Sequence, residues 1–256
     1  MKKYIMGILM FIMPSVVYGQ NCATPPSCET LGYTKTAADC SGKTILKCPF
    51  DNNKVYCDDA AGTARPKAGD IYYSNGSFSS DVIAGKTPIG VVGFVRGKNG
   101  LIVALEEKLV QWQKKEGTAV NCPKATDDNY KLDFNGDVIS ACIARVCQDC
   151  EAVEYCNSFS TAGTSAGDWF LPSEGEIRFY AANFDKINAG LKKLSKTLLQ
   201  ESYQSGIYPE EYYKSFYWES SINSNKYYAY SFFMPSGGGN SIGKEMNAKA
   251  RCVMLF

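Results

Sequence analysis

Hydrophobic positions divide the chain into segments of different periodicity. Between residues 71 and 107, apolar side chains come in short runs, with turn signals at Asn75-Gly76 and from Gly97 to Gly100. Such runs bounded by turn residues are typical of β-strands joined in hairpins. We therefore expect a hairpin over residues 71–78 and two further strands over residues 88–107.

Two central segments have helical periodicity. Between residues 140 and 157, apolar side chains recur three and four positions apart. These positions are Ile143, Val146, Cys150 and Val153. A second helix is expected to begin at Ser173, because Glu176 three residues later has the spacing of a capping box, and its apolar positions continue to Leu194. From residue 216 the pattern returns to strands. We predict an α+β fold with mixed or antiparallel strands and two main helices.

The first sixty residues have a different composition. Lys2 and Lys3 precede an apolar run from Ile5 to Met13, followed by small residues before Gln20. We expect a secretory signal peptide over residues 1–19 and no transmembrane segment in the mature chain. Residues 20–59 hold five cysteines and few large apolar side chains, which predicts a small disulfide-rich module. Residues 60–68 are typical of a linker, and residues 69–256 form the expected main domain.

The composition removes several classes of function. The chain has 27 Lys and Arg, 26 Asp and Glu, and no histidine. Loss of Lys2 and Lys3 with the signal peptide leaves a net charge of −1, so no basic surface for nucleic acid or for membrane lipid is expected. Without histidine, the chain lacks the usual general base and the commonest transition-metal ligand.

Eleven cysteines in a chain predicted to be exported indicate disulfides before they indicate metal. Cys142, Cys147 and Cys150 begin like a plant-type iron–sulfur ligand run, with Cys156 behind them. Iron–sulfur and structural zinc are minor alternatives, because a cluster would be loaded after export in competition with thiol oxidation. The spacing alone does not choose how Cys122 and the first three of these cysteines pair. Since eleven is odd, one thiol is free, lies in a disordered segment, or links to a partner molecule.

The acidic stretch TDDNYKLDFNGD raises the question of a calcium site. Asp133, Asn135 and Asp137 alternate as in an EF-hand loop, but Val138 stands at the glycine position and Ala144 at that of the bidentate glutamate. We expect a solvated loop and no metal.

Several motifs, taken in order, resemble a known group of proteins. They are GDIYYSNGSFS, IGVVGFV, GLIVALEE, NGDVIS, GDWFLPSEGEI, YWESS and the terminal ARCVMLF. From Gly69 to Phe256 the chain resembles the exported bacterial C-type-lectin-like domains of unknown function, with DWFLPS and YWESS as the most specific part. These domains are akin in fold to formylglycine-generating enzymes and to the variable receptor-binding proteins of diversity-generating retroelements. The front module resembles short cysteine-rich segments that precede some of them.

The resemblance implies a lectin-like fold with one disulfide between the first helix and the last strand. The positions that fit are Cys156 and Cys252, with a free core cysteine at 252 as the alternative. Closing a loop of about 97 residues would contribute roughly 4–5 kcal/mol. Catalysis is not implied, because formylglycine-generating enzymes carry a copper-binding cysteine pair near the end of the domain, where Cys252 stands alone. We expect neither an enzyme nor a cofactor.

Aromatic residues gather near the end of the chain. Between Tyr203 and Phe233, twelve of 31 residues are aromatic, against 33 in the whole chain. Trp218 and the phenylalanines suit core packing of half-buried strands. Tyr, Ser, Asn and Gly together are typical of adaptable binding surfaces, and the resemblance implies a ligand surface near this segment. The candidate ligand-binding residues are Ser221, Asn223, Asn225, Tyr227, Tyr228, Tyr230 and Asn240.

The preferred hypothesis is an exported recognition or adhesion protein of the periplasm, cell surface or medium. It would bind a glycan or a surface protein through residues 220–240, and a variant of it is a receptor binder diversified by a retroelement. One alternative is a structural component of the cell envelope or of an appendage, joined through the cysteine-rich module. Another is a thiol-redox or metal-dependent enzyme that uses Cys142, Cys147 and Cys150.

Overall fold

The computed structural model describes residues 28, 34–40, 44–47, 53–58, 65–96, 99–115, 119–122, 133–199 and 212–256 of the chain. The predicted signal peptide and residues 60–64 of the predicted linker lie outside these ranges. Within them, no helix is both long and apolar enough to cross a membrane. In the cysteine-rich module, strand β1 (Thr44–Lys47) pairs antiparallel with β2 (Val55–Asp58), and a disulfide joins Cys40 to Cys57.

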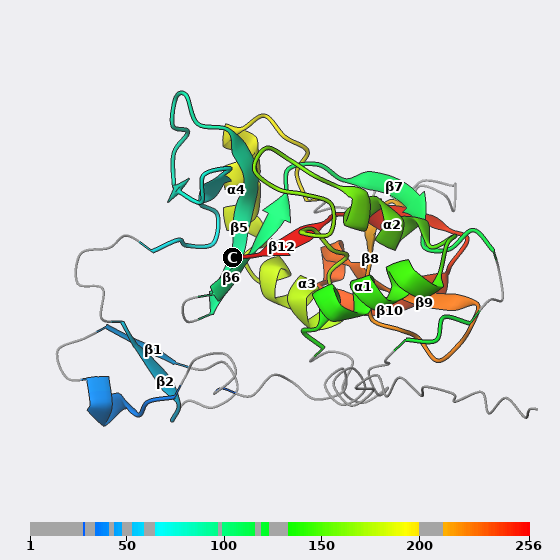
Figure 1. Cartoon of the computed structure of the whole chain (residues 1–256), viewed down its shortest axis with the longest axis horizontal. Helices are drawn as coiled ribbons and strands as arrows, with labels where there is room; N and C mark the ends of the chain where they lie inside the picture. Colours follow the sequence, from blue (N-terminus) through cyan, green and yellow to red (C-terminus); the bar gives the residue numbers. More distant parts are fainter. Residues whose placement is uncertain are drawn as a thin grey trace, which may run out of the picture.

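The main domain contains two five-stranded sheets (Figure 1). The first has the order β12-β6-β5-β3-β4, and every pairing in it is antiparallel. Its strands are β3 (Ile71–Tyr73), β4 (Phe78–Ser79), β5 (Pro88–Arg96), β6 (Asn99–Ala104) and β12 (Val253–Leu255). The β3–β4 hairpin and the β5–β6 pair are those predicted from the sequence.

The second sheet has the order β10-β9-β8-β11-β7. Its strands are β7 (Lys108–Gln111), β8 (Phe216–Trp218), β9 (Tyr228–Phe233), β10 (Gly238–Gly243) and β11 (Asn247–Ala250). Only β11 and β8 run parallel, so the sheet is mixed. Strand β10 lies at one edge and β7 at the other, and a short 3-10 helix (Met234–Ser236) connects β9 to β10.

Each of the two predicted helices is divided in two. The first is α1 (Gly136–Val146) followed by α2 (Glu151–Ser158), because Cys147 has extended backbone and the 147–150 segment forms a corner between them. The second is α3 (Glu174–Ala181) followed by α4 (Phe184–Lys193). There the Asn183 amide donates to the carbonyls of Gly93 and Phe179, a side-chain bond that competes with helix continuation. Among the described residues from 65 to 256, four α-helices beside two five-stranded sheets confirm the α+β class.

Side chains alternate across the second sheet and build a core on each face. Phe216 and Trp218 face a cluster that includes Ile143 of α1 and Val153 of α2. Tyr217, between them, faces a cluster shared with the α3 and α4 side chains and with the first sheet. Helix α3 therefore lies between the two sheets, while α1 and α2 cover the outer face of the second.

The C-terminal segment connects these layers. Cys252 is fully buried and joined by a disulfide to Cys156 of α2, the pair that the resemblance implies. The neighbouring Arg251 is also buried, and its guanidinium donates to Glu107 Oε2 from Nη2 at 2.7 Å and from Nε at 3.0 Å. Lys249 approaches the other Glu107 oxygen at 2.8 Å. Removing one partner from a buried charge network of this kind is strongly destabilising.

Helix α3 begins with the predicted capping box, and the box is buried. Glu176 Oε2 accepts from the Ser173 amide at 2.8 Å, and Ser173 Oγ lies 2.9 Å from the same oxygen. Burial raises the pKa of the Glu176 carboxyl to about 8, although the bonds from Ser173 act in the opposite direction. The folded protein therefore keeps Glu176 protonated at a pH where the unfolded chain ionises it.

We predict that the Cys156–Cys252 disulfide stabilises the domain more than the Cys147–Cys150 disulfide does. Cross-linking positions 96 residues apart removes more entropy from the unfolded chain than cross-linking positions 3 residues apart. The expected losses are about 4–5 kcal/mol for Cys156→Ala/Cys252→Ala and about 2 kcal/mol for Cys147→Ala/Cys150→Ala. Urea unfolding monitored by tryptophan fluorescence measures both losses. If the two double variants lose equal stability, or if Cys147→Ala/Cys150→Ala loses more, the prediction is wrong.

We also predict that stability falls as the pH rises from 5 to 8. Between the unfolded pKa of Glu176, about 4.5, and its folded pKa, about 8, the native state binds more protons than the unfolded state. One such group gives a slope of up to about 1.4 kcal/mol per pH unit. Glu176→Gln should make the decline shallower, whereas the exposed Glu106→Gln should leave it unchanged. Stability that stays constant or rises over this range would contradict the prediction.

Candidate ligand-binding site

The candidate site is centred on the loop between β8 and β9, and the first part of this loop is buried. The Glu219 amide donates to Tyr230 O at 3.2 Å, and the Ser220 amide donates to Pro172 O at 2.9 Å. Ser221 Oγ accepts from the Glu174 amide and donates to Asp133 Oδ2, both at 3.1 Å. Ser221 is fully buried and committed to these bonds, so it fixes the loop and is not placed to touch a ligand.

The second part of the loop is exposed and held by its own asparagines. Asn223 Oδ1 accepts from the Asn225 amide at 2.8 Å, and Asn225 Oδ1 accepts from the Tyr227 amide at 2.9 Å. The Asn223 amide group also donates to Ser241 Oγ on β10. Such side-chain bonds to the following backbone stabilise turns. Both predicted asparagines therefore hold the shape of the loop.

Two exposed tyrosines lie where this fixed loop meets β9, of which Tyr228 is the first residue. Tyr227 and Tyr228 are 49% and 45% exposed, among the most exposed large side chains of the described chain. Tyr230 was also expected to bind the ligand, but it lies in the middle of β9 and is only 9% exposed. Asn240 is exposed on β10, but its Oδ1 accepts from the Ser241 amide at 2.7 Å. Of the seven candidates, Tyr227 and Tyr228 are the ones free to offer a contact surface.

These tyrosines line a groove of 290 Å³ at the β10 edge of the second sheet. The other lining residues are Tyr213, Ser241, Ile242, Gly243, Glu245 and Met246. Tyr213 precedes β8, and Glu245 and Met246 belong to the turn between β10 and β11. None of these six residues was among the candidates expected from the sequence. Nothing in the spacing of these residues shows that the β8–β9–β10 pairing brings them together.

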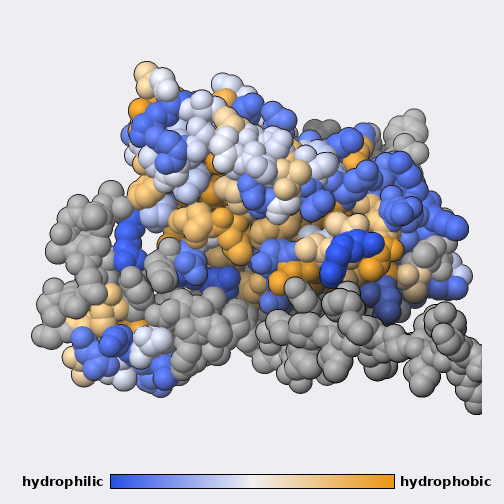
Figure 2. Space-filling view, viewed as in Figure 1, coloured by the Kyte–Doolittle hydropathy of each residue, from blue (hydrophilic) through white to orange (hydrophobic). Residues whose placement is uncertain are grey.

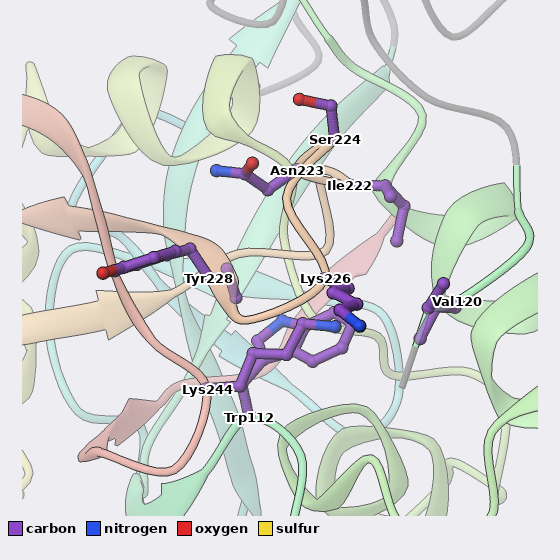
Figure 3. A pocket seen from close by; sticks show the side chains of 10 residues that line it. Trp112, Val120, Ile222, Asn223, Ser224, Lys226, Tyr228 and Lys244 are labelled. Atoms are coloured by element: carbon purple, nitrogen blue, oxygen red, sulfur yellow. The ribbon is translucent and has the colours of Figure 1, made fainter. Parts of the chain in front are cut away.

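A second, smaller pocket lies on the other side of the loop (Figure 3). Its volume is only 20 Å³, room for about one water molecule. Lys244 extends along the Trp112 ring, with Nζ 4.8 Å from the ring centroid, and donates to Gln113 Oε1 at 3.0 Å. Tyr228 points away from this pair in Figure 3. We interpret the pocket as a support for the loop.

The cysteines between residues 122 and 150, some of which were considered as metal ligands, form disulfides. Disulfides join Cys122 to Cys142 and Cys147 to Cys150. The expectation that Cys147 and Cys150 lie within one helix is wrong, because Cys147 caps the end of α1 and Cys150 precedes the first residue of α2. In the described residues, Asp149 is the carboxylate close to this pair.

The acidic stretch is also placed differently from the prediction. Asp133 is buried rather than solvated, and burial raises the pKa of its carboxyl to about 6. Its Oδ1 accepts from the Asn135 amide at 3.1 Å at the start of α1, while Oδ2 accepts from Ser221. Asp133 therefore connects α1 to the β8–β9 loop. Residues 126–132 of the stretch lie outside the described residues.

Two surfaces away from the tyrosine groove are partly apolar. In Figure 2, hydrophobic residues gather around the end of β12 and over α1. A pocket of 480 Å³ near β12 is lined by Phe94, Phe134, Leu255 and Phe256 beside Arg96. A shallower one of 620 Å³ along α1 combines apolar with polar side chains, namely Val138, Ala141 and Ala144 with Asp137, Arg145 and Asn157. Neither surface was expected from the sequence.

Comparison with known proteins gives a likeness of fold. No protein-family model matches the chain, and no curated protein matches it by sequence. Among solved structures, the chain is similar to a fimbrial protein from Bacteroides ovatus ATCC 8483, with a TM-score of 0.57 and 16% identity. The match covers 74% of this chain and 48% of the fimbrial protein, so the chain spans about half the length of that protein. At this identity, what the two share is the fold.

Proposed function

We propose that this chain is an exported, non-catalytic recognition or adhesion protein that binds a glycan or a protein ligand at the tyrosine groove. The observation that carries the proposal is the pair Tyr227 and Tyr228, each about half exposed on a loop whose shape is fixed by Asn223 and Asn225. Exposed tyrosines supply rigid contact area at low entropic cost. A loop that is already ordered loses little further freedom on binding.

Export is supported by the disulfides as well as by the predicted signal peptide. Four disulfides join described cysteines, in the front module and the main domain, and such bonds persist in oxidising compartments. The C-type-lectin-like resemblance and the fold likeness to a fimbrial protein both fit a protein of the bacterial surface. A non-catalytic role fits the lack of histidine and the pairing of Cys142, Cys147 and Cys150 in disulfides.

We predict that Tyr227→Ala/Tyr228→Ala reduces ligand binding at least tenfold, because two hot-spot aromatics are removed at roughly 1–2 kcal/mol each. Screening the full chain on glycan and surface-protein arrays identifies the ligand, and calorimetry compares the variants. Leu109→Ala is the matched control, since Leu109 is 41% exposed on the opposite edge strand of the same sheet. Unchanged binding by the double variant, with an unchanged unfolding midpoint, would remove the proposed site.

A second candidate is a structural subunit of an appendage, and the observation that favours it is the fimbrial neighbour. In that case the chain assembles with partners through the front module, and the odd cysteine is the expected covalent link. Non-reducing electrophoresis of cell envelopes separates the two functions. A ladder that collapses on reduction supports assembly, whereas a monomer counts against a disulfide-linked appendage.

A further inference from the structure

Glu245 is a carboxylate in the tyrosine groove, and none of the described residues that line the groove is cationic. It lies in the turn after β10, where its backbone carbonyl accepts from Gln111 Nε2 at 2.8 Å and the Met246 amide donates to Gly243 O at 3.0 Å. Its side chain folds over Gly243, so that a methyl group at that position would collide with the carboxylate. Within the described residues, the Glu245 carboxylate makes no ion pair and no hydrogen bond.

Two other acidic side chains near the same sheet have cationic partners. Glu107 is paired with Lys249 and Arg251, and Glu151 is paired with Lys114 at 2.8 Å. Glu245 differs from both because it lines the groove together with Tyr213, Tyr227 and Tyr228. A carboxylate in a groove lined by aromatic residues favours a cation, since the faces of aromatic rings are themselves negative.

The sheet that carries the groove repeatedly places ammonium groups on aromatic rings. Lys226 Nζ lies 4.9 Å from the Tyr227 ring centroid, and Lys249 Nζ lies 5.3 Å from that of Tyr217. In the second pair, the same ammonium group also contacts the Glu107 carboxylate. A ring, a carboxylate and an ammonium group together are therefore a combination that this protein already uses. In the groove, Glu245 and the tyrosines supply the first two.

We propose that the groove binds an ammonium group, and that the ligand carrying it is a glycan with unacetylated amino sugars. The inference rests on the proposed function and names the ligand class of the same site. A glycan fits better than a lysine side chain because the groove is wide and shallow, and is lined by three tyrosines and by Ser241. A lysine stem needs a narrow apolar channel for its methylene groups.

The test compares two oligosaccharides of equal length that differ in charge. Chitosan oligomers carry free amines, and chitin oligomers carry the same sugar backbone with acetylated nitrogens. The full chain is titrated with each at pH 5.5, where the amines are protonated, and binding is measured by calorimetry. We expect chitosan oligomers to bind at least about tenfold more tightly than chitin oligomers. Equal affinities, or no binding of chitosan oligomers at millimolar concentration, would overturn the proposal.

Glu245→Gln removes the negative charge of this side chain while keeping its size and shape. We expect it to weaken binding of chitosan oligomers by roughly 3- to 30-fold while leaving the weaker binding of chitin oligomers unchanged. Glu106→Gln is the matched control, since it removes an exposed carboxylate of the same chain and leaves the groove intact. An equal effect of both variants would indicate non-specific attraction of the polycation and would overturn the proposal.

Three further outcomes separate this inference from the proposed function. If Glu245→Gln weakens binding of a lysine-rich peptide but no amino-sugar oligomer binds, the glycan assignment is wrong. If a neutral ligand depends on Tyr227 and Tyr228 but not on Glu245, the ammonium inference fails and the recognition function stands. If binding depends on neither the tyrosines nor Glu245, both fail.

Discussion

The Cys156–Cys252 bond is the constraint on which the arrangement of layers depends. It ties α2 to a C-terminal segment that also belongs to the first sheet, where Val253 pairs with Val103 and bridges to Phe170. Beside it, Arg251 and Glu107 form a buried ion pair at the junction of the two sheets. Covalent closure of a long loop and a buried charge pair both penalise any alternative placement of this segment. The second sheet and the loops at its edge are thereby held against the helices.

The position of the tyrosine groove depends on how the second sheet and its loops are held against the helices. The β8–β9 loop is anchored at its base by Ser221, which bonds to Asp133 and to the first turn of α3, and its tip is shaped by asparagines. Aromatic residues within β8 and β9 fill the core, whereas Tyr227 in the loop and Tyr228 at the first position of β9 remain exposed. The same composition thus serves two purposes, and backbone position separates them. A rigid base with a preformed tip suits recognition, because little ordering is needed when a ligand binds.

The sequence predicted the fold class, the first hairpin, the start of α3 and the exposed tyrosines, because each depends on local pattern. It missed the breaks at Cys147–Cys150 and Asn183, which arise where a corner or a tertiary side-chain bond competes with helix continuation. It counted Ser221 and Tyr230 as ligand residues, although Ser221 is buried at the base of the loop by its bonds to Asp133 and Glu174, and Tyr230 is buried within β9. It missed Glu245, since only the pairing of β9 with β10 and the turn that follows bring this residue to Tyr228.

Hydrogen–deuterium exchange of the full chain, with and without the ligand identified on arrays, tests the central claim most directly. We expect bound ligand to slow exchange in peptides covering residues 223–228 and 241–246, and to leave exchange in α1 and at the end of β12 unchanged. Protection confined to the surface along α1 or to the pocket around Phe94 and Phe256, with the tyrosine loop unaffected, would contradict this claim.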